Sequence, residues 1–229
     1  MQRIFDILFS GIALILLSPL FFCLMIILRF SGEGEVFFFQ ERIGKNNRRI
    51  KLFKFATMLK NSEHIGTGTV TLHNDPRILP IGGFLRKTKV NELPQLINIL
   101  NGDMSIIGPR PQTQRCFDAF PKISQEEIVK VRPGLSGIGS IVFRNEEELM
   151  HANHTPDKFY DETIMPYKGS LEQWYVLHQN IWTYFSFIGL TVWVVLNPNS
   201  RLVWKMFKDL PNPPNILKES LKFPDSHLK

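Results

Sequence analysis

The longest apolar stretch of the chain lies near its N-terminus. Residues 7–28 contain no charged side chain. At about 1.5 Å per helical residue this stretch is long enough to cross the hydrocarbon layer of a bilayer. It is too long for a typical cleaved signal peptide, and no small-residue cleavage site closes it. Arg3 and Arg29 flank it on both sides, so flanking charge selects no direction of insertion. The pattern predicts a membrane helix.

The dipeptide Ser18-Pro19 interrupts the middle of this helix. Proline removes a backbone hydrogen bond and clashes with the preceding turn, so a kink is predicted there. Two arrangements are compatible with a kink. One is a kinked helix that spans the membrane, and the other is a re-entrant helix-break-helix that enters and leaves through the same leaflet. Residue physics alone favours the spanning helix, because kinked spanning helices are tolerated.

Short alternating segments follow the N-terminal helix. Residues 36–39 and 50–55 are rich in aromatic and β-branched side chains and flank a polar turn at 44–49, which predicts a β-hairpin. Apolar residues recur at helical spacing in 92–101, so this stretch is predicted to be a helix with one apolar face. Asn91 is the predicted N-cap of that helix.

The C-terminal half is predicted to be mainly helical, with helices over 111–130 and 145–165 and a turn at 168–170. Residues 181–196 are apolar, uncharged and rich in aromatics, but short for a spanning helix. They suit either the membrane interface or a buried core helix. Residues 202–208 combine aromatics with lysines and again suit an interface.

Composition narrows the class of protein. The 229 residues favour one main domain with extensions, and a net charge of +6 favours anionic partners such as phospholipid, nucleotides or nucleic acid. Nucleic-acid binding would explain the charge but leaves the apolar N-terminus unexplained. The two cysteines, Cys23 and Cys116, lie in unlike contexts, which argues against a disulfide framework.

The candidate chemistry is concentrated between residues 84 and 111. Arg86, Lys87 and Arg110 can neutralise a diphosphate, with Arg110 held in the rigid loop Gly108-Pro109-Arg110-Pro111. Glu92 and Asp103 are candidate Mg²⁺ ligands, because Mg²⁺ usually needs only one or two carboxylates besides substrate phosphate. Taken singly, the basic cluster is better explained as a solvated or lipid-facing surface, and Asn91-Glu92 as a helix cap with a favoured acid in the first turn.

Other catalytic motifs are missing from the sequence. There is no Walker loop, no GxGxxG and no Cys/His set with zinc spacing. His151 and His154 lie on a polar stretch and are interpreted as surface residues.

The motifs together resemble the bacterial sugar transferases known as monotopic phosphoglycosyl transferases. The resemblance covers residues 2–196, and the order of the motifs makes it specific. It is carried by Arg3-Ile-Phe-Asp6, Ser18-Pro19, Phe38-Phe-Gln-Glu-Arg-Ile-Gly44, Phe53-Lys-Phe55, Leu85-Arg-Lys-Thr88, Glu92-Leu-Pro-Gln-Leu96, Gly102-Asp-Met-Ser105 through Pro111, Arg132-Pro-Gly134 and Trp174-Tyr175-Val176.

The resemblance implies transfer of a sugar 1-phosphate from a UDP-sugar to polyprenyl phosphate, with release of UMP and with Mg²⁺ as cofactor. It implies a place at the cytoplasmic face of the bacterial inner membrane, at the first membrane step of a capsule, exopolysaccharide or O-antigen glycan. It also implies that the N-terminal helix is re-entrant, which reverses the preference for a spanning helix. Arg144 is a further expected phosphate ligand, placed by its position after Arg132-Pro-Gly134.

Two positions depart from the family pattern. The family uses an Asp-Glu pair in which the aspartate forms a covalent phosphosugar intermediate; here the aspartate position is Asn91, while Glu92 matches. Ala56 stands where the family usually has arginine. Asn91 is explained by an introduced substitution that traps substrate, by a natural branch in which Glu92 acts as nucleophile or supports direct displacement, or by a pseudoenzyme. The second departure favours an active natural branch.

The resulting prediction is an α+β, mainly helical, monotopic membrane protein. It comprises a re-entrant membrane helix (1–30), a catalytic domain with a short β-hairpin (31–178), and interfacial amphipathic helices with a tail (179–229). The predicted partners are a UDP-sugar, polyprenyl phosphate and the phospholipid bilayer, without nucleic acid, and the apolar C-terminal segments allow a homodimer. The alternatives are an inactive membrane scaffold or nucleotide-sugar-binding protein, and a nucleic-acid-binding domain on a single membrane anchor.

Overall fold

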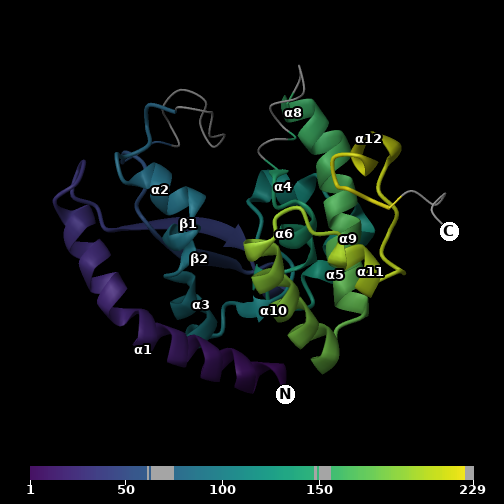
Figure 1. Ribbon diagram of the computed structural model, residues 1–229, viewed down its shortest axis with the longest axis horizontal. Helices are drawn as coiled ribbons and strands as arrows, with labels where there is room; N and C mark the ends of the chain where they lie inside the picture. Colours follow the sequence, from purple (N-terminus) through teal and green to yellow (C-terminus); the bar gives the residue numbers. More distant parts are fainter. Residues whose placement is uncertain (61, 63–74, 147–148, 150–155, 225–229) are drawn as a thin grey trace. The chain divides into compact units, whose positions relative to one another are not determined.

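The computed structural model (Figure 1) describes residues 1–60, 62, 75–146, 149 and 156–224. Within these ranges the chain is mainly helical with two small two-stranded sheets, β1-β2 and β3-β4, so the predicted α+β class is confirmed. The elements are α1 (Gln2–Arg29), β1 (Phe37–Ile43), η1 (Lys45–Asn47), β2 (Arg49–Phe55), α2 (Gly82–Lys87), η3 (Val90–Glu92), α3 (Gln95–Asn101), β3 (Ser105–Ile107), α4 (Gln114–Asp118), α5 (Lys122–Ile128), β4 (Gly134–Ser136), α6 (Ile138–Val142), α8 (Pro156–Phe159), η4 (Tyr160–Ile164), α9 (Met165–Leu177), α10 (Ile181–Leu196), α11 (Leu202–Met206) and α12 (Asn215–Lys218).

Contacts divide the chain into two compact units. Unit 1 contains Met1–Ile4, Arg42–Ile50 and Gly102–Lys229, and unit 2 contains Phe5–Glu41 and Lys51–Asn101. This division reflects which residues contact one another. The predicted segments 1–30, 31–178 and 179–229 are instead defined by membrane and catalytic roles, so they stay a prediction.

Helix α1 continues through the predicted break. Pro19 lies inside it, and its missing N–H deprives the carbonyl of Ile15 of the usual i−4 donor. The Ser18 hydroxyl donates to that carbonyl at 2.8 Å, which compensates for the loss. Figure 1 shows this purple helix changing direction part-way along its length. The break is therefore a bend within one continuous helix.

The α1 helix is the one element of the described ranges long and apolar enough to cross a membrane. Only 11% of its most apolar window is buried inside the protein. Length and composition alone define this candidate, and its course relative to a bilayer stays a prediction.

Unit 2 packs α1, the base of the hairpin and α2 around a small core. Leu24 and Leu28 of α1 meet Phe55 of β2 and Leu85 of α2. Helix α3 is fixed to β2 by Asn98, whose side chain accepts from the Phe53 N–H at 2.9 Å and donates to the Lys51 carbonyl at 2.8 Å. This one amide side chain thus pairs a backbone N–H and a backbone carbonyl of β2 that a third strand would otherwise pair.

Unit 1 is built on the long helix α9, which contacts α5, α6 and η4, while α10 contacts α6, β3 and β4. Strands β3 and β4 are parallel, with Ser105 opposite Gly134 and Ile107 opposite Ser136. One core cluster, Phe117, Phe120, Ile128 and Met165, joins α4 and α5 to α9.

Two predicted boundaries in unit 1 are wrong. The single helix predicted over 111–130 is two helices, α4 and α5, because Pro121 stands at the start of α5 and cannot continue the preceding helix. The turn predicted at 168–170 is helical, because α9 runs through it. A Cβ on Gly169 would lie 3.0 Å from Pro121 and 3.1 Å from Phe120, so this glycine lets α9 pack closely against these two residues.

The C-terminal predictions have mixed outcomes. Part of 145–165 lies outside the described residues, and the described part contains α8 and η4. Helix α10 has the predicted bounds, with one buried face and one exposed face that includes Trp182 and Trp193. In and after α11, Trp204 and Phe207 are buried, so the aromatics of 202–208 face the protein. The interfacial role of these helices stays a prediction.

Candidate functional site

Unit 2 holds the predicted catalytic pair and two of the predicted phosphate-binding cations. Arg86 and Lys87 lie in the last turn of α2, and Asn91 and Glu92 lie in the short 3₁₀ turn η3. Lys89 links these elements in a left-handed conformation with a φ of 60°. This conformation lets η3 follow α2 directly, and the two elements are in contact.

Asn91 does not cap the helix, so the N-cap prediction is wrong. The α3 helix begins only at Gln95, and Asn91 lies within η3. Its side chain is buried, with 7% of the residue exposed, and its Oδ1 has no hydrogen-bond partner. The N–H of Glu92 donates to the Lys89 carbonyl at 3.0 Å, so this N–H is not free to bind phosphate. An unpartnered buried amide oxygen favours a ligand-directed role for Asn91.

Glu92 faces a lysine that the sequence interpretation missed. The Lys54 ammonium lies 3.4 Å from Glu92 Oε1, and the two side chains are 15% and 12% exposed. Lys54 comes from β2, within the block Phe53-Lys-Phe55. A cation in an otherwise aromatic strand block was the available signal. Its partner could not be read from the sequence, because the two residues are 38 positions apart.

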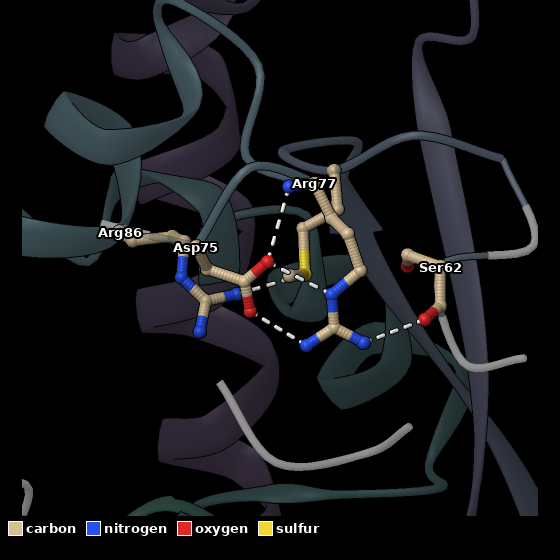
Figure 2. Close-up of polar contacts among 5 residues, drawn as sticks. Ser62, Asp75, Arg77 and Arg86 are labelled. Atoms are coloured by element: carbon tan, nitrogen blue, oxygen red, sulfur yellow. Dashed lines mark hydrogen bonds and ion pairs between the residues drawn. The ribbon is translucent and has the colours of Figure 1, made fainter. Parts of the chain in front are cut away.

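A buried ion pair supports the segment that contacts Arg86 (Figure 2). The Arg77 guanidinium donates twice to the Asp75 carboxylate, at 2.8 and 2.6 Å, and once to the Ser62 carbonyl at 2.7 Å. Arg77 is 3% exposed and Asp75 is 6% exposed. Close by, Arg86 Nη1 lies 3.7 Å from the sulfur of Met58. The guanidinium and the carboxylate thus form a bidentate clamp between two residues of one short segment.

Unit 1 holds the other predicted residues. Asp103 lies in the turn before β3, Arg110 in the loop after β3, and Arg144 is exposed after α6. The Arg110 loop is paired with the Arg132-Pro-Gly134 segment, because the Gly134 N–H donates to the Pro109 carbonyl at 2.8 Å. The Arg110 loop and the Arg132-Pro-Gly134 segment, which are separate in the sequence, are therefore joined by backbone hydrogen bonding.

Helix α9 carries a buried acid beneath the Arg110 loop that the sequence interpretation did not identify. Glu172 is fully buried, and its Oε1 accepts from the Arg110 backbone N–H at 3.1 Å. Its Oε2 has no hydrogen-bond partner. Burial raises the pKa of Glu172 to about 7, although hydrogen bonds from the backbone and the charges of Lys168 and Arg110 oppose the rise. A Lys/Glu pair four residues apart within a largely apolar helix was the available signal.

This raised pKa predicts a pH-dependent effect of Glu172→Gln. The protonated carboxyl is the form that the fold prefers, so its contribution is complete below the ordinary pKa of 4.5 and is lost as the pH rises through about 7. Glutamine resembles the protonated form at every pH. We expect the variant to unfold at the wild-type temperature at pH 5, and roughly 5 °C higher at pH 8. Thermal unfolding in detergent across this range measures the difference, and a constant difference would contradict the assigned pKa.

No group of three or more His, Cys, Asp or Glu residues able to hold a metal ion occurs within the described ranges. The residues at η3 nevertheless fit a cation that takes most of its ligands from substrate and water. Glu92 offers a carboxylate, and the unpartnered Oδ1 of Asn91 offers a neutral oxygen. Mg²⁺ is commonly bound in this way, through one or two protein oxygens and substrate phosphates. Lys54 is the competing cation at Glu92.

Comparison with known proteins defines the class. A family model described as bacterial sugar transferase matches residues 1–198. The chain belongs to the bacterial sugar transferase family, and the resemblance inferred from the motifs is confirmed.

The matched region makes up different shares of the individual relatives. The exopolysaccharide production protein ExoY of Sinorhizobium fredii is 38% identical over 159 residues, which cover 63% of this chain and 70% of ExoY. The exopolysaccharide production protein PSS of Rhizobium leguminosarum is 43% identical over 148 residues, covering 62% of this chain and 73% of PSS. The UDP-glucose:undecaprenyl-phosphate glucose-1-phosphate transferase of Escherichia coli is 37% identical over 143 residues, covering 62% of this chain but 31% of that protein.

Proposed function

We propose that this chain transfers a sugar 1-phosphate from a UDP-sugar to a polyprenyl phosphate and releases UMP, at the first membrane step of an exopolysaccharide or related glycan. The observation that carries the proposal is the family match over residues 1–198, which includes every predicted site residue. The name of the E. coli relative, which specifies UDP-glucose and undecaprenyl phosphate, supports the substrate class.

In this reaction an oxygen of the polyprenyl phosphate becomes bonded to the β-phosphorus of the UDP-sugar. The bond from that phosphorus to the bridging oxygen breaks, and the electron pair leaves with UMP. Such phosphoryl transfers depend mainly on positioning and on neutralising charge. Bound Mg²⁺ would supply part of that neutralisation.

The residues of unit 2 are proposed to perform the chemistry. Glu92 either attacks the β-phosphorus itself or supports direct displacement by the polyprenyl phosphate, because the amide of Asn91 is a poor nucleophile. Both roles use the carboxylate of Glu92, and the Lys54 ammonium lies 3.4 Å from its Oε1. Arg86 and Lys87 bind phosphate, and Asn91 contributes its unpartnered oxygen to the cation.

The residues of unit 1 are proposed to bind the donor. Arg110 and Arg144 bind phosphate oxygens, and Asp103 contributes to the cation site or supports the loop before β3. These roles rest on the motifs in which the residues lie. The hydrogen-bonded backbone of the Arg110 loop supports these roles, because it fixes the position of the Arg110 backbone from which the side chain projects.

We further propose that α1 is re-entrant and that the chain acts at the cytoplasmic face of the bacterial inner membrane. Two observations support a bent helix within lipid. The apolar side chains of α1 are largely exposed, and the Ser18 hydroxyl donates to the Ile15 carbonyl that Pro19 leaves without its usual donor. Cysteine labelling at positions 3 and 33 in sealed vesicles tests this arrangement. Labelling from the same face supports it, and labelling from opposite faces contradicts it.

A binding measurement tests the proposed substrate class separately from turnover. UDP with Mg²⁺ should raise the melting temperature of the purified protein, because a ligand that binds the folded state stabilises it. A DNA or RNA oligonucleotide of equal phosphate concentration is the control. Stabilisation by the oligonucleotide but not by UDP would support the nucleic-acid alternative and overturn the proposal.

A further inference from the structure

Two residues of α9 hold the segments that carry the predicted phosphate-binding arginines of unit 1. We infer that Lys168 and Glu172 are positioning residues for the donor phosphates, with Glu172 acting through Arg110 and Lys168 acting through the segment of Arg144. This inference rests on the proposed function. It adds two residues that touch neither substrate nor cation.

Glu172 acts on the backbone of the Arg110 loop. Its Oε1 accepts from the Arg110 N–H at 3.1 Å, and a Cβ on Gly139 would collide with this same oxygen. The carboxylate is therefore enclosed by α6 on one side and by the Arg110 loop on the other. Because the acceptor is fully buried, it moves little, and the backbone from which the Arg110 side chain projects is fixed.

Lys168 lies one helical turn before Glu172 and acts on a different segment. Its ammonium lies 2.8 and 2.9 Å from the two carboxylate oxygens of Glu146, and it stands 5.5 Å above the ring of Phe143. The lysine side chain is 3% exposed and that of Glu146 is 26% exposed, so the ammonium is shielded from solvent and the carboxylate is partly exposed. Arg144 lies between these two contacts in the sequence, and the segment that carries it is held on both sides.

The electrostatic surroundings of Glu172 agree with a positioning role. The groups that act on it are Lys168 on its own helix, Arg110 on the loop and the backbone N–H of Gly139 on α6. From α5, Ser124 donates to the neighbouring Gln173 at 2.8 Å. From η4, Tyr160 stays protonated, because burial and the charge of Glu146 raise its pKa. Burying an acid costs folding free energy, so stability alone does not account for Glu172. A role in positioning the Arg110 loop does.

A mutant cycle with UDP and Mg²⁺ tests the inference. Glu172→Leu removes the acceptor at similar volume, and we expect about a tenfold loss of UDP affinity and a raised KM for the UDP-sugar. Glu172→Gln keeps an acceptor oxygen and should stay within about twofold of wild type. Gln173→Ala, which loses the Ser124 hydrogen bond on the same helix, is the matched control and should also bind as wild type.

The double variants separate positioning from general stability. If Glu172 acts through Arg110, adding Glu172→Leu to Arg110→Ala should weaken UDP binding no further. The same non-additivity is expected for Lys168→Met combined with Arg144→Ala. Fully additive losses, or equal losses in Glu172→Gln and Glu172→Leu, would overturn the inference.

The outcomes also separate this inference from the proposed function. If wild type binds no UDP, the proposed function fails. If wild type binds UDP and Arg110→Ala weakens binding, while Glu172→Leu folds and binds normally, only the positioning role fails. Hydrogen exchange at the Arg110 amide gives a readout without ligand, and we expect it to quicken in Glu172→Leu and to stay slow in Glu172→Gln.

Discussion

Replacing Glu92 by glutamine should lower the rate of UMP release by about a thousandfold or more, because the reaction then loses its one carboxylate at η3. Asn91 supplies only a neutral amide, so no neighbouring acid of η3 can compensate. The side chain stays close in size, and the fold should be retained. Steady-state assay with a saturating UDP-sugar, polyprenyl phosphate and Mg²⁺ measures the effect on kcat.

A matched acid is available as control in the same unit. Glu35 also pairs with a lysine, Lys60, at 2.9 Å, but both side chains are at least half exposed. Glu35→Gln should leave kcat within about twofold of wild type, since exposed pairs contribute little. If Glu92→Gln retained more than a tenth of wild-type activity, Glu92 would not be the catalytic carboxylate.

Replacing Gly82 by alanine should destabilise the protein by about 4 kcal/mol and reduce its folded yield. A Cβ at this position would collide with the carbonyl oxygen of Thr57, and lie 3.0 Å from the carbonyl carbon of the same residue. The obstacle is backbone, which cannot rotate away as a side chain can. Because α2 carries Arg86 and Lys87, any protein that folds should also lose UDP affinity. Thermal unfolding measures the first effect and UDP titration the second.

The adjacent glycine is a stringent control. A Cβ on Gly83 meets nothing within 4 Å, and the residue is exposed in the same helix. Gly83→Ala should therefore stabilise the protein by about 0.5–1 kcal/mol through helix propensity. Equal behaviour of the two alanine variants would contradict the close contact between Gly82 and Thr57.

Long and strongly patterned elements were predictable from the sequence. The α10 helix has the predicted bounds, because its asparagine cap and the Asn197-Pro198-Asn199 stop are both local signals. The β-hairpin was also predicted from local signals, because two aromatic and β-branched stretches flank a polar turn. The helix predicted over 111–130 is divided at Pro121, which precedes α5 and is itself a local signal. At 168–170, packing of Gly169 against Phe120 overrides the local preference for a turn.

The parts of the candidate site that could not be predicted depend on long-range contacts. Lys54 meets Glu92 across 38 residues, and Glu172 meets the Arg110 backbone across 62 residues. Local propensity marked Asn91 as the N-cap of the following helix, which is wrong because α3 begins only at Gln95. It could not show that the side-chain oxygen is buried without a donor. The motif resemblance identified the family, whereas its assignment of site residues stays a prediction and the partners within each unit required coordinates.

The central claim is that this chain is an active transferase although Asn91 stands at the aspartate position. The most direct test is UMP release by the purified wild-type chain, supplied with a panel of UDP-sugars, undecaprenyl phosphate and Mg²⁺. We predict turnover with at least one UDP-sugar, lost in Glu92→Gln. No UMP from the chain with Asn91, together with UMP release by Asn91→Asp under the same conditions, would contradict the account and identify this chain as inactive.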